Sequence, residues 1–143
     1  DFTLAVAALG AVLGLLNTWR AFAKDRPRLR VNVKAWLNSY WDSGFCIEIA
    51  NTGFAPVSVA QVGVLLSRPR GQIFLFAPYG IGVQSFPHAL GAGESMTVYA
   101  PPATDEHPAL VYASRAFART ATGLLFRSPR REVRRHFAKR RPA

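Results

Sequence analysis

A long apolar run opens the chain. The segment from Phe2 to Trp19 holds eighteen residues without a charge or a proline, and Leu, Ala and Val dominate it. As an α-helix rising about 1.5 Å per residue, this run would span roughly 27 Å, close to the hydrocarbon thickness of a bilayer. The pattern predicts a transmembrane anchor over residues 1–23. A secretory signal peptide and a buried core helix are the alternatives.

The charges around the run favour the anchor. A signal peptide carries positive charge before its apolar segment, whereas here Asp1 precedes the run and the basic residues follow it. Those basic residues are Arg20, Lys24, Arg26, Arg28 and Arg30. By the positive-inside rule we predict an outside N-terminus and a cytoplasmic domain. The abundance of Arg, Ala, Gly and Pro is typical of a high-GC bacterial genome, so we expect a single-pass protein of a bacterial inner membrane.

Small residues recur on one face of the predicted helix. Gly10 and Gly14 form a G-x-x-x-G pair, and Ala7 and Ala11 continue the same face. A face of this kind lets the backbone of another helix approach closely in lipid. We therefore predict that these four residues pack against integral membrane subunits. The alternative is that the motif only reflects a helix rich in Ala and Gly.

After residue 28 the apolar pattern changes to a period of two. Apolar and polar side chains alternate over 29–34 and 45–50, and Gly, Pro and Asn separate further short apolar runs. Those runs lie at 57–66, 73–76, 95–100, 110–117 and 124–126, with a loop expected at 78–87 and a bulge or close backbone approach at Gly63. About seven or eight short strands with turns between them predict a mainly β chain with an antiparallel β-sandwich over residues 24–127.

Two turn motifs and the basic segment after the helix make the chain similar to a known group. The turn residues are Asn51, Gly53, Pro56 and Val57 in one motif and Gly93, Glu94 and Ser95 in the other. With these motifs, residues 2–127 resemble small, largely uncharacterised bacterial membrane-anchored proteins with an immunoglobulin-like β-sandwich domain. The resemblance implies this fold for the domain and implies no particular function.

Residues 128–143 form a basic tail. From Arg127 to the C-terminus the chain has eight basic residues and one acid, Glu132. Ser-Pro at 128–129 suits the start of a short amphipathic helix, and a solvated tail is the alternative. Because the predicted strands end near residue 126, we expect the domain to fold without this tail. The tail could bind anionic lipid headgroups, an acidic protein surface or phosphates.

Membrane partners are favoured over nucleic acid for the basic residues. The anchor holds the tail near headgroups, and the tail has few aromatic side chains that could stack on bases. Nucleic acid is therefore an unlikely partner by this reasoning. The residues predicted to meet an anionic surface or partner are Arg26, Arg28, Arg30, Arg130, Arg131, Arg134, Arg135, Lys139, Arg140 and Arg141.

Composition agrees with one small domain plus an anchor. The chain has 143 residues, half of them hydrophobic, and a formal net charge of +10 that calls for anionic partners. A single cysteine, Cys46, excludes an internal disulfide and suits a reducing compartment. The aromatic side chains exceed what a domain of this size needs inside. We expect Phe74 and Phe76 in the core, and Trp41, Tyr79 and Phe86 in contact with a partner.

Signals for catalysis are weak. The three histidines lie in separate segments, and no metal-binding, nucleophile or phosphate-loop motif occurs. Neighbouring residues such as 105–107 rarely converge on one metal ion. We therefore predict no catalytic residue, no cofactor and no metal ligand.

The predicted function is that of a non-enzymatic accessory or assembly subunit of a larger membrane protein complex. One helix would dock against other helices, and the extrinsic β-sandwich would clamp partner subunits. A respiratory or photosynthetic assembly would be a suitable host, although no residue selects either. The alternative is a free membrane-tethered binding module that recruits an acidic soluble ligand or nucleic acid. An enzyme is the least favoured class.

Overall fold

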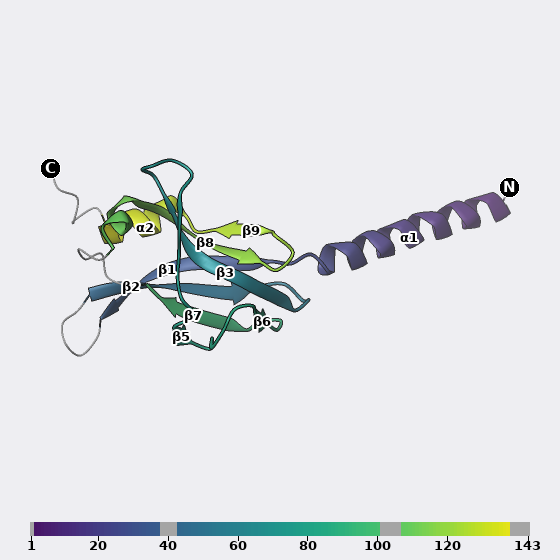
Figure 1. Cartoon of the computed structure of the whole chain (residues 1–143). Coiled ribbons are helices and arrows are strands. Elements are labelled where there is room, and N and C mark those ends of the chain that lie inside the picture. Colours follow the sequence, from purple (N-terminus) through teal and green to yellow (C-terminus); the bar gives the residue numbers. More distant parts are fainter. Residues whose placement is uncertain (1, 38–42, 101–106, 138–143) are drawn as a thin grey trace.

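A long helix and a mainly β domain make up the chain (Figure 1). The computed structural model describes residues 2–37, 43–100 and 107–137. Helix α1 (Phe2–Lys24) extends away from the domain, and none of its 23 residues is buried. Among the described residues, α1 is the one helix that is long and apolar enough to cross a bilayer. The predicted N-terminal apolar helix is confirmed.

The domain consists of two antiparallel sheets. The first has the strand order β1-β2-β7-β5 and the second the order β4-β3-β8-β9, with β6 paired to the start of β3. The strands of the first sheet are β1 (Leu29–Leu37), β2 (Ser43–Asn51), β7 (Ser95–Tyr99) and β5 (Gly80–Ile81). Those of the second are β4 (Ile73–Leu75), β3 (Val57–Leu66), β8 (Ala113–Thr120), β9 (Leu125–Arg127) and β6 (His88–Leu90).

The inward side chains of both sheets form one core. Alternation turns Val31 and Val33 of β1 and Ile47 and Ile49 of β2 inward, as the sequence predicts. The second sheet contributes buried Val and Ala side chains of β3 and β8 to the same cluster. Phe76 is buried in this core, which confirms its prediction, whereas Phe74 is only partly buried against it.

Some of the predicted strands differ from the structure. The bounds of β3 match the predicted run, whereas the first part of 110–117 is a 3-10 helix, Pro108–Tyr112. Proline fixes φ and lacks an N–H, so it suits a helical first turn better than a strand, and Leu110 is buried by that turn. The predicted loop at 78–87 contains the two-residue strand β5. Gly63 marks a close approach, since a Cβ there would clash with the Phe74 carbonyl oxygen.

The segment after residue 127 belongs to the domain. It forms α2 (Arg130–Phe137), which packs against β8 and β1, and Val133 is completely buried. Before it, buried Ser128 exchanges hydrogen bonds with Ala116: its N–H donates to the carbonyl oxygen, and its Oγ accepts the Ala116 N–H. This differs from the expected independent tail. The core is completed by a residue that lies beyond the last strand.

The antiparallel strands give the domain two distinct ends. At the anchor end, where α1 enters, Leu29 pairs with Asn51, and Val59 near the start of β3 pairs with Thr120. Figure 1 places the β8–β9 turn at this end as well. At the far end, Leu66 pairs with Ala113. We use "anchor end" and "far end" in this sense below.

Candidate functional site

The small-residue face of α1 is open along its length. Ala7, Gly10, Ala11 and Gly14 are all exposed, and nothing lies within 4 Å of a Cβ placed at either glycine. The Thr18 hydroxyl donates to the Gly14 carbonyl oxygen at 2.8 Å, which satisfies this hydroxyl within the helix. The four predicted packing residues therefore lie on one accessible face, and the packing of another helix there stays a prediction.

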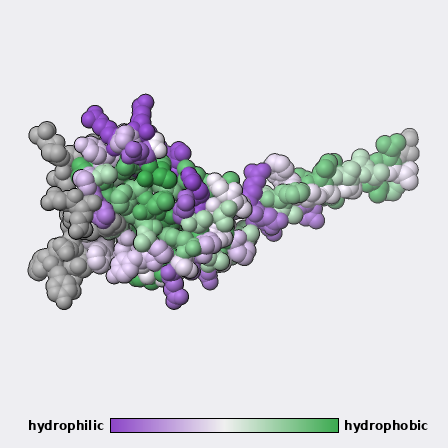
Figure 2. Space-filling model, viewed as in Figure 1, coloured by the Kyte–Doolittle hydropathy of each residue, from purple (hydrophilic) through white to green (hydrophobic). Residues whose placement is uncertain are grey.

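Basic residues gather where α1 meets the domain. Figure 2 shows hydrophilic side chains at this junction, between the hydrophobic helix and the β domain. Lys24, Arg26, Arg28 and Arg30 are exposed there, with Asp25 as the neighbouring acid. The junction thus combines an excess of positive charge with the end of an apolar helix.

An aromatic groove lies at the far end of the domain. It has a volume of about 470 Å³. Its lining is almost wholly apolar, and we call it the aromatic groove. The described residues that line it are Trp36, Phe74, Leu75, Phe76, Ala77, Tyr79, Tyr99, Ala100 and His107. A groove of this volume with aromatic and apolar walls is typical of sites that bind a partner's side chains or an apolar ligand.

Ring contacts hold the walls of the aromatic groove. On one side, the centroids of Trp36 and Tyr99 lie 5.0 Å apart, and those of Tyr99 and Tyr79 lie 5.8 Å apart. On the other side, Phe74 contacts the His107 ring edge-on at 5.4 Å. The Tyr99 N–H donates to the Tyr79 carbonyl oxygen at 2.8 Å, which fixes the β4–β5 connection against β7. Packing and backbone hydrogen bonds therefore pre-form the groove.

The predicted partner contacts fall in different environments. Tyr79 is 71% exposed at the rim of the aromatic groove. Phe86 is partly buried and packs against the core cluster, which leaves less of its ring for a partner. Trp41 lies outside the described residues. The structure therefore brings Tyr79 to an accessible apolar surface and directs Phe86 mostly inward.

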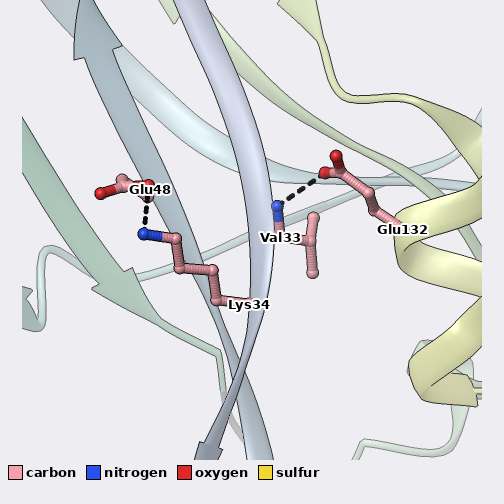
Figure 3. Close-up of polar contacts among 4 residues, drawn as sticks. All are labelled: Val33, Lys34, Glu48 and Glu132. Carbon is pink, nitrogen blue, oxygen red and sulfur yellow. Dashed lines mark hydrogen bonds and ion pairs between the residues drawn. The ribbon is translucent and has the colours of Figure 1, made fainter.

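Cys46 lies on the outer face of the first sheet. This side chain points away from the core, as its alternation with Phe45 predicts, yet it is only 7% exposed. Burial raises the pKa of the Cys46 thiol, so the thiol stays protonated and is a poor nucleophile. Next to it, Lys34 Nζ and Glu48 Oε2 form an ion pair at 2.7 Å (Figure 3). The Lys34 hydrogen bond is the main cause that lowers the pKa of Glu48.

Helix α2 presents arginines outward while its acid faces the domain. The Glu132 carboxylate accepts the backbone N–H of Val33 at 2.9 Å (Figure 3), so this acid is directed toward β1. Four arginines on the helix are exposed, and none of them forms an ion pair among the described residues. These residues, which we call the α2 arginines, are Arg130, Arg131, Arg134 and Arg135. Lys139, Arg140 and Arg141 lie outside the described residues.

The described residues offer little to catalysis. No group of three or more His, Cys, Asp and Glu side chains in that part of the chain could hold a metal ion. His107 lies in the aromatic groove against Phe74, whereas His88 lies on β6. Asp105 and Glu106 lie outside the described ranges. A groove lined by aromatic rings is suited to binding an apolar group.

Of the groove residues, sequence reasoning predicted only Tyr79 as a partner contact, and those it missed include Trp36, Tyr99 and His107. A signal was present for two of them, because Trp36 and Tyr99 occupy outward positions in alternating strands. Large aromatic side chains at such positions indicate a surface that is covered or used for binding.

Comparison with known proteins assigns no function to these surfaces. No protein-family model matches the chain, and no curated protein matches it either.

Proposed function

We propose that the chain is a membrane-anchored, non-enzymatic accessory subunit of a larger membrane protein complex. The observation that carries this proposal is the contrast between the helix and the domain. The domain encloses its own core, whereas α1 is apolar and has no buried residue. An apolar helix of 23 residues needs lipid or other helices around it, because water would leave its whole surface hydrated.

We further propose that the domain is an immunoglobulin-like β-sandwich. In constant-type immunoglobulin domains, one sheet has the order A-B-E-D and the other contains C-F-G. The order β1-β2-β7-β5 matches the first, and β3-β8-β9 matches the second, with β4 as an added edge strand. Domains of this architecture serve in many contexts as rigid binding scaffolds, so the fold is compatible with an extrinsic subunit.

Two surfaces support a role in assembly. The small-residue face of α1 suits helix packing in lipid, and the aromatic groove suits a partner outside it. Trp, Tyr and Arg dominate the binding energy of many protein interfaces, and the groove offers Trp36, Tyr79 and Tyr99. With the basic residues that follow α1, the positive-inside rule supports a cytoplasmic domain, and the anchor would then span a bacterial inner membrane.

Gentle detergent extraction tests the proposal. We expect the full-length chain to co-migrate with a large complex at a fixed stoichiometry, measured by native electrophoresis and mass spectrometry. Tyr79→Ser should reduce this co-migration, since it removes a ring from the groove rim. Tyr112→Ser is the matched control, because Tyr112 is 42% exposed and does not line the groove. A small monodisperse species for the unsubstituted chain would contradict an accessory subunit.

The exposed α2 arginines favour one alternative, a free membrane-tethered module that recruits an acidic soluble ligand. Their positive charge is held on a docked helix and faces outward. In that case the extracted protein would be small, and it would bind acidic ligands with a strong dependence on salt. The same extraction experiment therefore separates the two functions.

A further inference from the structure

Two large apolar side chains project from the anchor end of the domain. Phe54 lies in the β2–β3 connection and is 73% exposed, and Leu124 lies in the β8–β9 turn and is 46% exposed. Both segments lie at the end where α1 enters. Exposed apolar side chains on neighbouring loops point to a surface that meets an apolar phase or a partner.

Hydrogen bonds fix the loop that carries Phe54. Asn51 is 1% exposed, and its side-chain amide donates to the carbonyl oxygens of Ala55 at 2.8 Å and Leu90 at 3.0 Å. Its Oδ1 accepts the Gly53 N–H at 3.0 Å. The Thr52 N–H donates to the Arg28 carbonyl oxygen at 2.8 Å, which ties the loop to the linker from α1. Phe54 is therefore held in place beside the end of the anchor.

The turn that carries Leu124 is fixed in a similar way. The Thr120 N–H donates to the Leu124 carbonyl oxygen at 2.9 Å, and the Leu124 N–H donates to Thr120 Oγ1 at 3.0 Å. The Ala121 N–H donates to the Ser58 carbonyl oxygen at 2.8 Å. Because Ser58 follows the Phe54 loop directly, the two exposed side chains belong to one end surface.

Basic residues accompany this surface. Arg26, Arg28 and Arg30 are all exposed, within the linker and the first residues of β1. Three acids lie near them in the structure. Asp25 is in the linker, Glu94 accepts the Gly91 N–H through its carboxylate at 2.7 Å, and Glu48 pairs with Lys34 and also interacts with the charge of Arg30. Apolar side chains beside Arg and Lys are the combination that binds the interface of an anionic bilayer. A second copy of the same end would bring like charges together.

We propose that the anchor end rests on an anionic bilayer, with Phe54 and Leu124 inserted among the headgroups and Arg26, Arg28 and Arg30 on the lipid phosphates. This inference depends on the proposed function, because it takes α1 to span the same membrane. At about 3.3 Å per strand residue, the seated domain holds Trp36 and the aromatic groove roughly 23 Å farther from the membrane than Leu29. Seating would therefore direct the groove toward the extrinsic part of a partner.

Fluorescence of the full-length chain in vesicles tests the seating without any partner protein. A polarity-sensitive thiol label is placed at Phe54→Cys, Leu124→Cys or Tyr112→Cys, in vesicles of phosphatidylcholine with phosphatidylglycerol, with and without brominated lipid. Tyr112 is the control, since it is exposed at the far end. Leu9→Cys in α1 reports whether the anchor itself is in lipid. Cys46 is buried, so the unsubstituted chain serves as the labelling blank.

We expect a blue-shifted emission and a loss of fluorescence with brominated lipid at positions 9, 54 and 124, and neither change at 112. Replacing Arg26, Arg28 and Arg30 together by Gln should reduce the quenching at 54 when phosphatidylglycerol is present. If the label at 9 is in lipid while those at 54 and 124 remain in water, the seating is wrong and the anchor stands. If the label at 9 is also in water, the proposed anchoring fails as well.

Discussion

The Glu132 carboxylate accepts a hydrogen bond from the Val33 N–H at 2.9 Å, across 99 residues of sequence. Val33 lies on β1, the edge strand of its sheet, where N–H groups on the outer side have no strand partner. The one acid of the basic segment therefore closes a sheet edge and does not neutralise its neighbours. This contact, with buried Val133, makes α2 part of the domain and leaves its arginines free to meet an anion.

Truncating Val133, the buried side chain of α2, should destabilise the domain. We expect Val133→Ala to lower the free energy of unfolding by about 1–3 kcal/mol, because it leaves a cavity in the core. Glu132→Ala should cost about 1 kcal/mol through the unpaired Val33 N–H. Thermal unfolding followed by circular dichroism measures both changes. Arg134→Ala is the control on the exposed face of the helix and should change little.

Deletion of residues 128–143 should be more damaging than either substitution. It exposes the core around Val133 and removes the Ser128 Oγ that accepts the Ala116 N–H. We expect a clear fall in the unfolding temperature in the same measurement. A truncated chain as stable as the full chain would show that α2 contributes nothing to the fold.

Removing the charge of the α2 arginines should change binding without changing the packing of α2. Replacing Arg130, Arg131, Arg134 and Arg135 together by Gln leaves the buried contacts intact and removes like-charge pairs four residues apart. We therefore expect an unchanged or slightly raised unfolding temperature. Binding to the co-purifying complex should become weaker and less sensitive to salt, because fewer screened charges contribute. The same salt slope for both proteins would contradict an electrostatic role.

Bulk on the small-residue face of α1 should weaken helix packing. Gly10→Leu with Gly14→Leu adds side chains where another backbone would approach, while hydrophobicity still favours insertion. We expect retained membrane insertion, measured by carbonate extraction, and a smaller fraction of chain in the large complex. Ala5→Leu with Val12→Leu is the matched control, since at about 100° per residue these positions face the opposite side of the helix. Equal loss in both variants would argue against a specific face.

The Lys34–Glu48 ion pair should give a small, pH-dependent stabilisation. The folded pKa of Glu48 lies below its ordinary value of 4.5, so the stabilisation is present above that pH and is lost as the pH falls through the folded pKa. The pair is partly exposed, and we expect Glu48→Gln to cost less than about 1 kcal/mol at pH 7. Unfolding of both proteins at pH 7 and at strongly acidic pH should show the difference vanish in acid.

Burial of Cys46 should slow its reaction with thiol reagents. The raised pKa and the low exposure both reduce the accessible thiolate. We expect slow modification of the folded chain at mildly alkaline pH and a rate near that of a free thiol once the chain is unfolded in denaturant. Fast modification of the folded protein would contradict a buried Cys46 thiol.

Local sequence patterns predict much of the architecture. An unbroken apolar run determines α1, and a period of two determines β1 and β2, because each strand buries one face. The patterns fail where elements are too short to have a period, as in the two residues of β5 and the three of β6. They also fail at Pro108–Tyr112. The buried Leu110 lies in a helical turn there, although the apolar run around it predicts a strand.

The candidate surfaces depend on pairings that no local pattern contains. Trp36 meets Tyr99 because β2 lies between β1 and β7, and Glu132 reaches Val33 because α2 folds back on the first strand. Phe54 and Leu124 share one end because antiparallel strands bring distant turns together. The sequence by itself determined the apolar helix, the strand class and the positive charge, since each follows from neighbouring residues. Only the tertiary structure decided which side chains meet, because contacts between distant segments arise from packing.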